Sequence, residues 1–393
     1  MDLAARMSRL GTETAFEVLA RAQALEAQGR SVVHLEIGEP DFDTPAHIRQ
    51  AAAEALESGW THYGPSAGQK DLREAIAAYI ERTRGMYVDP AQVVVTPGGK
   101  PILFYAMLAL LEEGDEAIYP NPGFPIYESM IDFVGAKAVP LRLREDRAWS
   151  FDLDELASLI TPRTKLLVLN SPHNPTGGTL DRKALAGIAA LADTHPFMIL
   201  SDEIYSRMVY TGTHESIATF PGLAERTILL DGFSKTYAMT GWRLGYGVME
   251  KSLAVHVARL MTNSNSCTNS FVQQAGIAAL NGPQGPAEDM IAEFHRRRDR
   301  IVAGLNALPG TSCTVPNGAF YAFPNITGTG MASADLARAL LDEAGVAVLS
   351  GTAFGQFGEG YLRLSYANSI PNLEKALERM GTWLEEKLRT RAR

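Results

Sequence analysis

The sequence predicts an α/β fold in which a large domain with a mostly parallel seven-stranded sheet is joined to a smaller α+β domain. First, from about Asp71 to Met249 short β-rich apolar runs alternate with helical stretches, a rhythm typical of a parallel sheet covered by helices. Second, several of these runs are apolar throughout, as expected for strands buried on both faces. Third, the chain breaker Asn-Gly-Pro-Gln-Gly-Pro after Leu280 separates this block from a second, shorter alternation.

The elements follow in order along the chain. Seven apolar runs are the predicted strands of the large domain: Val93–Thr96, Glu116–Tyr119, Lys137–Leu141, Lys165–Leu169, Phe197–Ser201, Thr227–Leu230 and Leu244–Met249. Helices are expected between them over Asp71–Arg84, Pro101–Glu113 and Arg182–Ala192. Beyond the breaker we expect a helix over Pro286–Leu308 and strands over Phe320–Phe323, Ala347–Leu349 and Leu362–Ser365. The large domain is therefore expected to span residues 45–290, and the small domain to combine residues 1–44, with an N-terminal arm, and residues 291–393.

Composition narrows the possible functions. The 393 residues include 36 Lys and Arg against 45 Asp and Glu, a net charge of -9 that disfavours a nucleic-acid partner. The two cysteines, Cys267 and Cys313, provide neither a disulfide framework nor a zinc motif, and they favour a reducing cytoplasm. We expect no metal site, and no apolar stretch approaches the ~18 residues of a membrane span. The dinucleotide-binding motif G-x-G-x-x-G does not occur in complete form, which argues against a nicotinamide dehydrogenase. Pro101 follows Gly99-Lys100 where a nucleotide-binding phosphate loop needs Ser or Thr, so that motif is incomplete too.

Two side chains stand where catalytic chemistry is expected. Lys235 follows a predicted strand and lies among small residues, which permit the close approach to a carbonyl carbon that Schiff-base chemistry requires. Taken alone, such a lysine is more often a surface loop residue. Asp202 ends the run Phe197–Ser201, so it belongs at the carboxyl edge of the sheet, where open α/β sheets bind ligands. A helix N-cap is the alternative interpretation of Asp202.

The segment Gly232–Gly245 resembles the pyridoxal-phosphate attachment signature of the class I/II aminotransferases of fold type I, and the similarity is to aspartate and aromatic aminotransferases. Five further motifs follow in the family's order: Gly38–Pro45, Tyr63–Gly68, Asn170–Gly177, Ser201–Tyr205 and Tyr361–Tyr366. The resemblance implies a transferase of amino acid metabolism that moves an amino group between an L-amino acid and a 2-oxo acid through a pyridoxal 5'-phosphate Schiff base on Lys235. It also implies a homodimer with shared active sites. A pyridoxal-phosphate-dependent β-eliminating lyase on the same scaffold is the alternative, because the two reactions share their first steps.

The resemblance also assigns catalytic and cofactor-binding roles. Lys235 would attach the cofactor and then act as general base and acid, and Asp202 would pair with the pyridine nitrogen. Tyr205 and Asn174 would contact the cofactor's 3-oxygen. The ring of Phe124 would stack on the cofactor. The expected phosphate ligands are the glycine turn and helix start at Gly98, Gly99 and Lys100, together with Ser234, Arg243 and, from the neighbouring subunit, Tyr63.

Four residues are expected to hold the substrate. Arg363 would bind the α-carboxylate through two parallel hydrogen bonds, helped by the backbone N–H of Gly38 and by Asn174. Phe16 would cover the pocket. No second arginine or lysine is identified for a distal carboxylate, and glutamate with 2-oxoglutarate is the couple that the family resemblance implies.

Overall fold

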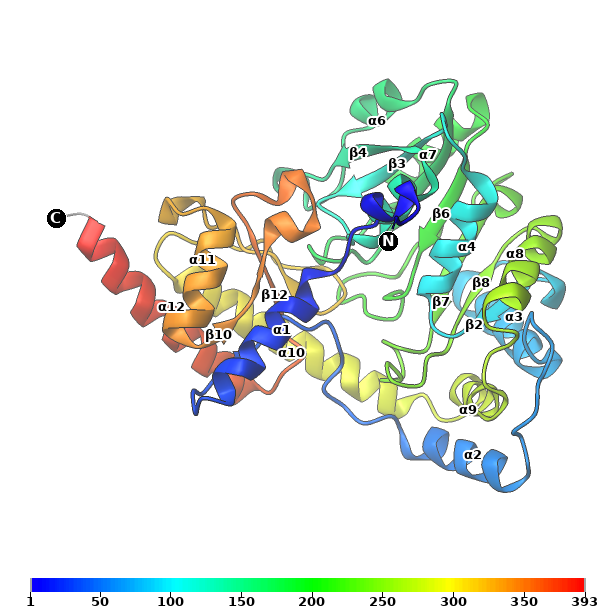
Figure 1. The fold of residues 1–393 in the computed structure, drawn as a ribbon, viewed down its shortest axis with the longest axis horizontal. Coiled ribbons are helices and arrows are strands. Elements are labelled where there is room, and N and C mark those ends of the chain that lie inside the picture. Colours follow the sequence, from blue (N-terminus) through cyan, green and yellow to red (C-terminus); the bar gives the residue numbers. More distant parts are fainter. Residues whose placement is uncertain (1, 392–393) are drawn as a thin grey trace.

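The computed structural model describes residues 2–391, and its largest element is a seven-stranded sheet (Figure 1). The strand order is β2-β8-β7-β6-β5-β3-β4; β8 runs antiparallel to both of its neighbours, and every other pair is parallel. The predicted mostly parallel seven-stranded sheet is therefore confirmed. The strand bounds are β2 Val93–Thr96, β3 Glu116–Asn121, β4 Lys137–Arg142, β5 Thr164–Asn170, β6 Met198–Asp202, β7 Thr227–Gly232 and β8 Gly245–Val248.

Helices cover both faces of this sheet, which explains why its strands are apolar throughout. In β5, Leu166 and Val168 belong to one hydrophobic cluster with residues of α4, α5 and α8, whereas Leu167 and Leu169 belong to another with residues of α6 and α7. The helices of this part are α2 Ala46–Glu57, α3 Lys70–Arg84, α4 Lys100–Leu110, α5 Ile126–Val134, α6 Leu153–Leu159, α7 Arg182–Thr194, α8 Lys251–Ser264 and α9 Ser270–Asn281.

A smaller α+β part contains a two-stranded sheet, β1-β10, and a three-stranded sheet, β11-β12-β9. The sequence predicts one strand over Ala347–Leu349, and the structure differs. The chain leaves the first sheet after Ala347 and enters the second at Leu349, with Val348 buried between them, so one apolar run serves two sheets. The bounds are α1 Thr14–Glu26, β1 Val33–His34, β9 Tyr321–Ala322, α11 Ser333–Ala339, β10 Val346–Ala347, β11 Leu349–Ser350, β12 Leu362–Ser365 and α12 Ile370–Arg391.

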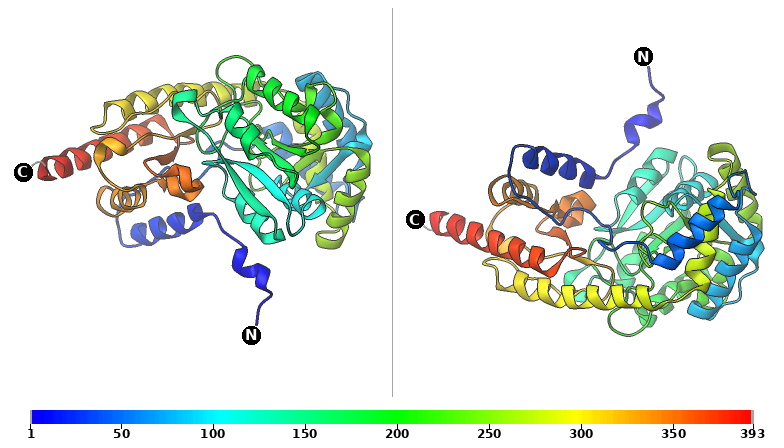
Figure 2. Two further views of the ribbon diagram at one scale, coloured as in Figure 1. Left: turned by 90° about the horizontal axis from the view of Figure 1, so that it is seen from above. Right: turned by 90° about the horizontal axis from the view of Figure 1, so that it is seen from below.

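The N-terminal segment touches both parts of the molecule. The 3-10 helix η1 (Ala5–Arg9) packs on α5, and the backbone N–H of Gly11 donates to Ser129 Oγ over 2.9 Å. The following helix α1 instead packs on β10 and β11. Figure 2 shows this segment in blue, reaching from the small part toward the large one. Residues 10–13 therefore form a crossing between the two parts.

Helix α10 (Gly285–Ala307) makes a second crossing. Its first turn places Ala287 in the cluster that includes Leu72 of α3, and its later residues Phe294 and Ile301 belong to the core of the small part. The helix is unbroken between these cores (Figure 1). The expected boundary at residue 290 falls inside it, and the division into domains stays a prediction.

Candidate active site

A cavity of about 540 Å³ lies at the carboxyl edge of the large sheet and is lined by residues from both parts of the molecule. Parallel strands bring their carboxyl ends to one edge, and Asn170 and Asp202 are paired in register at the ends of β5 and β6. Twelve of the fourteen predicted site residues line this cavity: Phe16, Gly38, Gly99, Lys100, Phe124, Asn174, Asp202, Tyr205, Ser234, Lys235, Arg243 and Arg363.

Lys235 extends into the cavity from the loop after β7. Its Nζ donates a hydrogen bond to the carbonyl oxygen of Gly38 over 2.5 Å. Burial lowers the pKa of Lys235 from 10.5 to about 8, because an apolar environment disfavours the charged ammonium. About a tenth of this amine is therefore neutral at pH 7, and the neutral form is the one that a nucleophile or a general base requires.

Asp202 is buried at the end of β6 and is held on both carboxylate oxygens. Tyr127 OH donates to Oδ2 over 2.7 Å, and the backbone N–H of Ile204 donates to Oδ1 over 3.2 Å. Burial raises the pKa of Asp202 to about 6, although these two hydrogen bonds lower it in part. The carboxylate form still prevails at pH 7, so the side chain offers a negative charge to a cation in the cavity. The sequence reasoning did not identify Tyr127, whose role arises only because α5 packs beside β6.

A pair of tyrosines forms another wall of the cavity. The hydroxyl groups of Tyr205 and Tyr321 lie 2.7 Å apart, and the two rings meet edge to face. Burial, and then the neighbouring Tyr321, raise the pKa of Tyr205 well above its ordinary value, so its hydroxyl is protonated and can donate to a ligand. Tyr321 is a second site residue that the sequence reasoning missed, because it lies within the apolar run of a predicted strand.

The turn between β2 and α4 has the form of an anion-binding cradle. Gly98 has φ +92°, and a Cβ there would overlap the guanidinium of Arg243, so this close packing requires glycine. Gly98 is not itself among the lining residues. The turn leads into the N-terminus of α4 beside Arg243 and Ser234, a combination of free backbone N–H groups and a cation that suits a phosphate. Lys100 differs from the expectation in one respect: its ammonium forms an ion pair with Glu13.

Two buried polar atoms at the cavity have no hydrogen-bond partner within residues 2–391: the side-chain oxygen of Asn174 and Nε of Arg363. Arg363 is 4% exposed, donates from its other end to the carbonyl of Glu36, and stacks 4.7 Å from the centroid of the Tyr321 ring. Because unsatisfied buried polar atoms are costly, both atoms point to a ligand that satisfies them. The cradle, Asp202, the Lys235 amine and Asn174 fit the phosphate, ring nitrogen, aldehyde and polar ring substituents of the cofactor expected from the sequence, and Arg363 Nε fits a substrate carboxylate.

Tyr63 lies elsewhere. It belongs to the loop between α2 and α3, does not line the cavity, and is 90% exposed. Its expected contact with a neighbouring subunit therefore stays a prediction.

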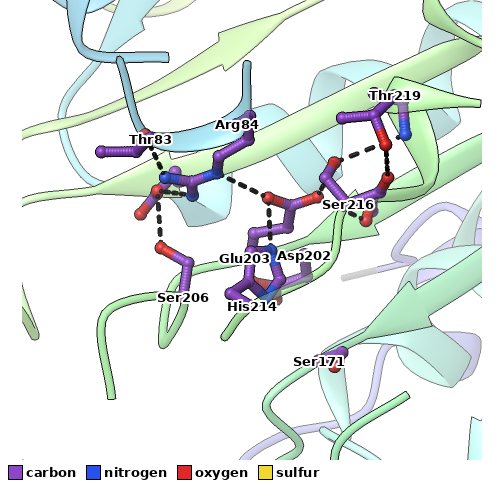
Figure 3. A network of polar contacts seen from close by, with 12 residues as sticks. Thr83, Arg84, Ser171, Asp202, Glu203, Ser206, His214, Ser216 and Thr219 are labelled. Carbon is purple, nitrogen blue, oxygen red and sulfur yellow. Dashed lines mark hydrogen bonds and ion pairs between the residues drawn. The ribbon is translucent and has the colours of Figure 1, made fainter. Parts of the chain in front are cut away.

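A buried ionic network adjoins Asp202 (Figure 3). Arg84 donates to Glu203 over 3.1 Å and to Asp231 over 2.6 Å, and all three side chains are at most 2% exposed. His214 Nε2 lies 2.8 Å from Glu203 Oε2, and the Ser216 hydroxyl donates to the other carboxylate oxygen, Glu203 Oε1. Burial alone would raise the pKa of Glu203, but His214, Arg84 and Ser216 together lower it to about 2. The network anchors the segment that follows Asp202 to α3 and β7.

Other kinds of site are less well supported. No group of three or more His, Cys, Asp or Glu side chains that could hold a metal ion occurs within residues 2–391. Over the same residues, no helix has the length and apolar character needed to cross a membrane.

Comparisons with known proteins agree with one another. Residues 30–380 match the family model for class I and II aminotransferases. The chain is 42% identical to an aspartate aminotransferase of Pyrococcus horikoshii, over 94% of both proteins, and 39% identical to aromatic-amino-acid aminotransferase 2 of Thermococcus litoralis, over 98% of this chain and 99% of that protein. The crystal structure of the aspartate aminotransferase from Rhizobium meliloti superposes with a TM-score of 0.94 at 36% identity, covering 98% of this chain and 99% of that one.

Proposed function

The chain belongs to the class I and II aminotransferases, and from this premise we propose that it carries out transamination with pyridoxal 5'-phosphate attached to Lys235. Transfer of an amino group between an amino acid and a 2-oxo acid is the activity of the family. The observation that carries the residue assignment is the presence, in one cavity, of a lysine with a lowered pKa, a buried carboxylate and an arginine with an unpaired nitrogen.

The cofactor, when bound, supplies an aldehyde carbon for amine exchange and a pyridine ring that accepts the electron pair released at the substrate α-carbon. Lys235 Nζ would carry the proton: its neutral amine would take a proton from the substrate α-carbon and deliver it to the carbon that the cofactor's aldehyde supplies. Asp202, which a hydrogen bond from Tyr127 keeps in place, would stabilise a positive charge on the ring nitrogen. The hydroxyl of Tyr205, which Tyr321 orients, would donate to the 3-oxygen.

The substrate carboxylate is assigned to Arg363. Its guanidinium is buried and stacked between the rings of Tyr321 and Phe354, so its orientation is set before a substrate arrives. A rigid guanidinium can present two parallel N–H groups to a carboxylate. Gly38 lines the same cavity, and a Cβ there would overlap the Tyr321 hydroxyl, so this close packing requires glycine. Phe16 lines the mouth of the same cavity.

We further propose that the enzyme is a cytoplasmic homodimer in which Tyr63 completes the partner's phosphate site. Leu56, Trp60 and Tyr63 are large apolar or aromatic side chains that are all more than 40% exposed within eight residues of sequence. An exposed apolar group of this kind is typical of an interaction surface. The two free cysteines support a reducing compartment.

An absorption experiment on the purified protein tests the proposed function. After reconstitution with pyridoxal phosphate, we expect a visible band that converts to a near-ultraviolet band when a single amino acid is added without any oxo acid. Accumulation of pyruvate and ammonia while the visible band persists would support the β-eliminating lyase instead. A protein that shows no band after reconstitution would contradict the assignment of Lys235.

The lowered pKa of Lys235 predicts a pH dependence of cofactor attachment. Only the neutral amine attacks an aldehyde, and a pKa of about 8 in place of 10.5 raises its neutral fraction at pH 7 about 300-fold. The rate of reconstitution of the cofactor-free protein should therefore rise with pH and level off above about pH 8. A stopped-flow absorbance series from pH 6 to 10 measures this rate. A rate that still rises tenfold per pH unit between 8.5 and 9.5 would contradict the lowered pKa.

A further inference from the structure

Two carboxylates that have no role in the assignments above line the wall of the cavity. Glu13 immediately precedes α1, on the crossing formed by residues 10–13, and Glu39 follows Gly38; both line the cavity. The Glu13 side chain is 19% exposed. Glu39 accepts a hydrogen bond from Thr240 Oγ1, and Thr240 lines the same cavity. Both carboxylates therefore bring negative charge to the wall of the cavity.

Four cations line the cavity, and three already have an assigned partner. Arg363 serves the α-carboxylate, Lys235 the reaction and Arg243 the phosphate. Lys100 remains, and its ammonium is ion-paired with Glu13 and lies 5.6 Å from the centroid of the Phe124 ring. A second carboxylate on a substrate would therefore have to displace Glu13 to reach a cation among the described lining residues.

The local charge count has a definite sign. Among the charged lining residues that have no assigned role, Glu13 and Glu39 contribute two negative charges and Lys100 one positive charge, a sum of -1. These charges also act on the reacting amine. Burial lowers the pKa of Lys235, whereas Glu39, the strongest of the charges that oppose burial, and Glu13 both raise it. A distal carboxylate in the cavity would experience the same charges as repulsion.

We propose that Glu13 and Glu39 make the site select against amino donors whose side chain ends in a carboxylate and in favour of donors whose side chain ends in a cation. The inference rests on the proposed function, since it concerns the side chain of the amino acid that Arg363 holds. Specificity of this kind depends on a repulsive element as much as on attraction. Because one cavity receives the amino acid and the oxo acid in turn, a monocarboxylic oxo acid is the matching acceptor. The proposal departs from the glutamate and 2-oxoglutarate couple that the family resemblance implies.

The test compares donors of equal length and different charge. On the holoenzyme with one fixed acceptor, kcat/KM is measured for glutamine against glutamate and for lysine against norleucine. We expect glutamine to exceed glutamate by about tenfold or more, and lysine to exceed norleucine. In the Glu13→Gln variant the glutamine-to-glutamate ratio should fall by about tenfold, because one repulsive charge is lost and Lys100 is released. Glu39→Gln should lower the same ratio in the same direction.

A matched control lies one turn further along the same helix. Glu17 is exposed, belongs to the first turn of α1 and does not line the cavity, so Glu17→Gln should leave both ratios unchanged. An equilibrium measurement supports the kinetics: calorimetric dissociation constants for the inert analogues glutarate and its monoamide should differ in the same order as the two donors. Glu13→Gln should reduce that difference.

Each outcome has a distinct meaning. A wild-type enzyme that uses glutamate as well as glutamine, or a Glu17→Gln variant that shifts the ratio as much as Glu13→Gln does, overturns the inference and leaves the proposed function intact. Absence of turnover with every donor, in a protein that binds the cofactor, overturns the proposed function and this inference with it.

Discussion

Replacing Lys235 with alanine should lower the rate of transamination by at least about 10⁴-fold while the protein remains folded. A positioned general acid–base group contributes 10²–10⁴-fold in typical enzymes, and loss of covalent attachment adds to that effect. Lys235 forms one side-chain hydrogen bond, to Gly38, so its removal leaves the hydrophobic clusters unchanged. Steady-state rates with a saturating oxo acid measure the loss, and the visible absorption band should disappear with it.

The control for this variant is Lys375→Ala. Lys375 is exposed on α12, does not line the cavity and donates a hydrogen bond to Ser31, so its loss should change the rate less than twofold. Circular dichroism of both variants checks that the fold is retained. If Lys235→Ala kept normal turnover, another group would have to attach the cofactor and the assignment would be wrong.

Replacing Arg84 with alanine should lower the free energy of unfolding by about 3–5 kcal/mol, the usual effect of breaking a buried ion pair from one side. The change leaves Glu203 and Asp231 buried without the guanidinium that pairs with both of them. Urea unfolding followed by fluorescence measures the difference. The network lies directly behind Asp202, so cofactor affinity should weaken in the same variant.

A neighbouring arginine on the same helix provides the comparison. Arg82 is exposed and donates to the carbonyl of Leu280, and Arg82→Ala should cost less than about 1 kcal/mol. The conservative Arg84→Lys variant keeps one positive charge but not the forked geometry, and should fall between the two. Equal stability of Arg84→Ala and Arg82→Ala would show that the network contributes little.

The parts of the fold that follow from local pattern were predictable. The strands Val93–Thr96 and Leu362–Ser365 have the predicted bounds, because continuous apolar residues and the turns beside them mark both strands in the sequence itself. The division of Ala347–Leu349 between two sheets was not predictable, because a continuous apolar run is expected both for one buried strand and for two short buried strands.

Some residues of the site could likewise be predicted from the sequence, and others could not. Asp202 and Lys235 could be placed from the sequence, because each follows a recognisable strand whose carboxyl end points to a common edge. Tyr127 and Tyr321 could not, since their roles depend on contacts with residues 75 and 116 positions away along the chain. The pairing of Glu13 with Lys100 likewise joins residues 87 positions apart and leaves no local signal.

Helix α10 determines where this chain can be divided into fragments. Its 23 residues extend for about 34 Å, at 1.5 Å per residue, from one hydrophobic core into the other. A cut at residue 290 would sever helical hydrogen bonds on both sides and detach Ala287 from Phe294 and Ile301. A cut in the preceding loop, at residues 282–284, keeps the helix whole. Two fragments produced by this cut should reassociate, because the first turn of α10, in the C-terminal fragment, would pack against the N-terminal fragment.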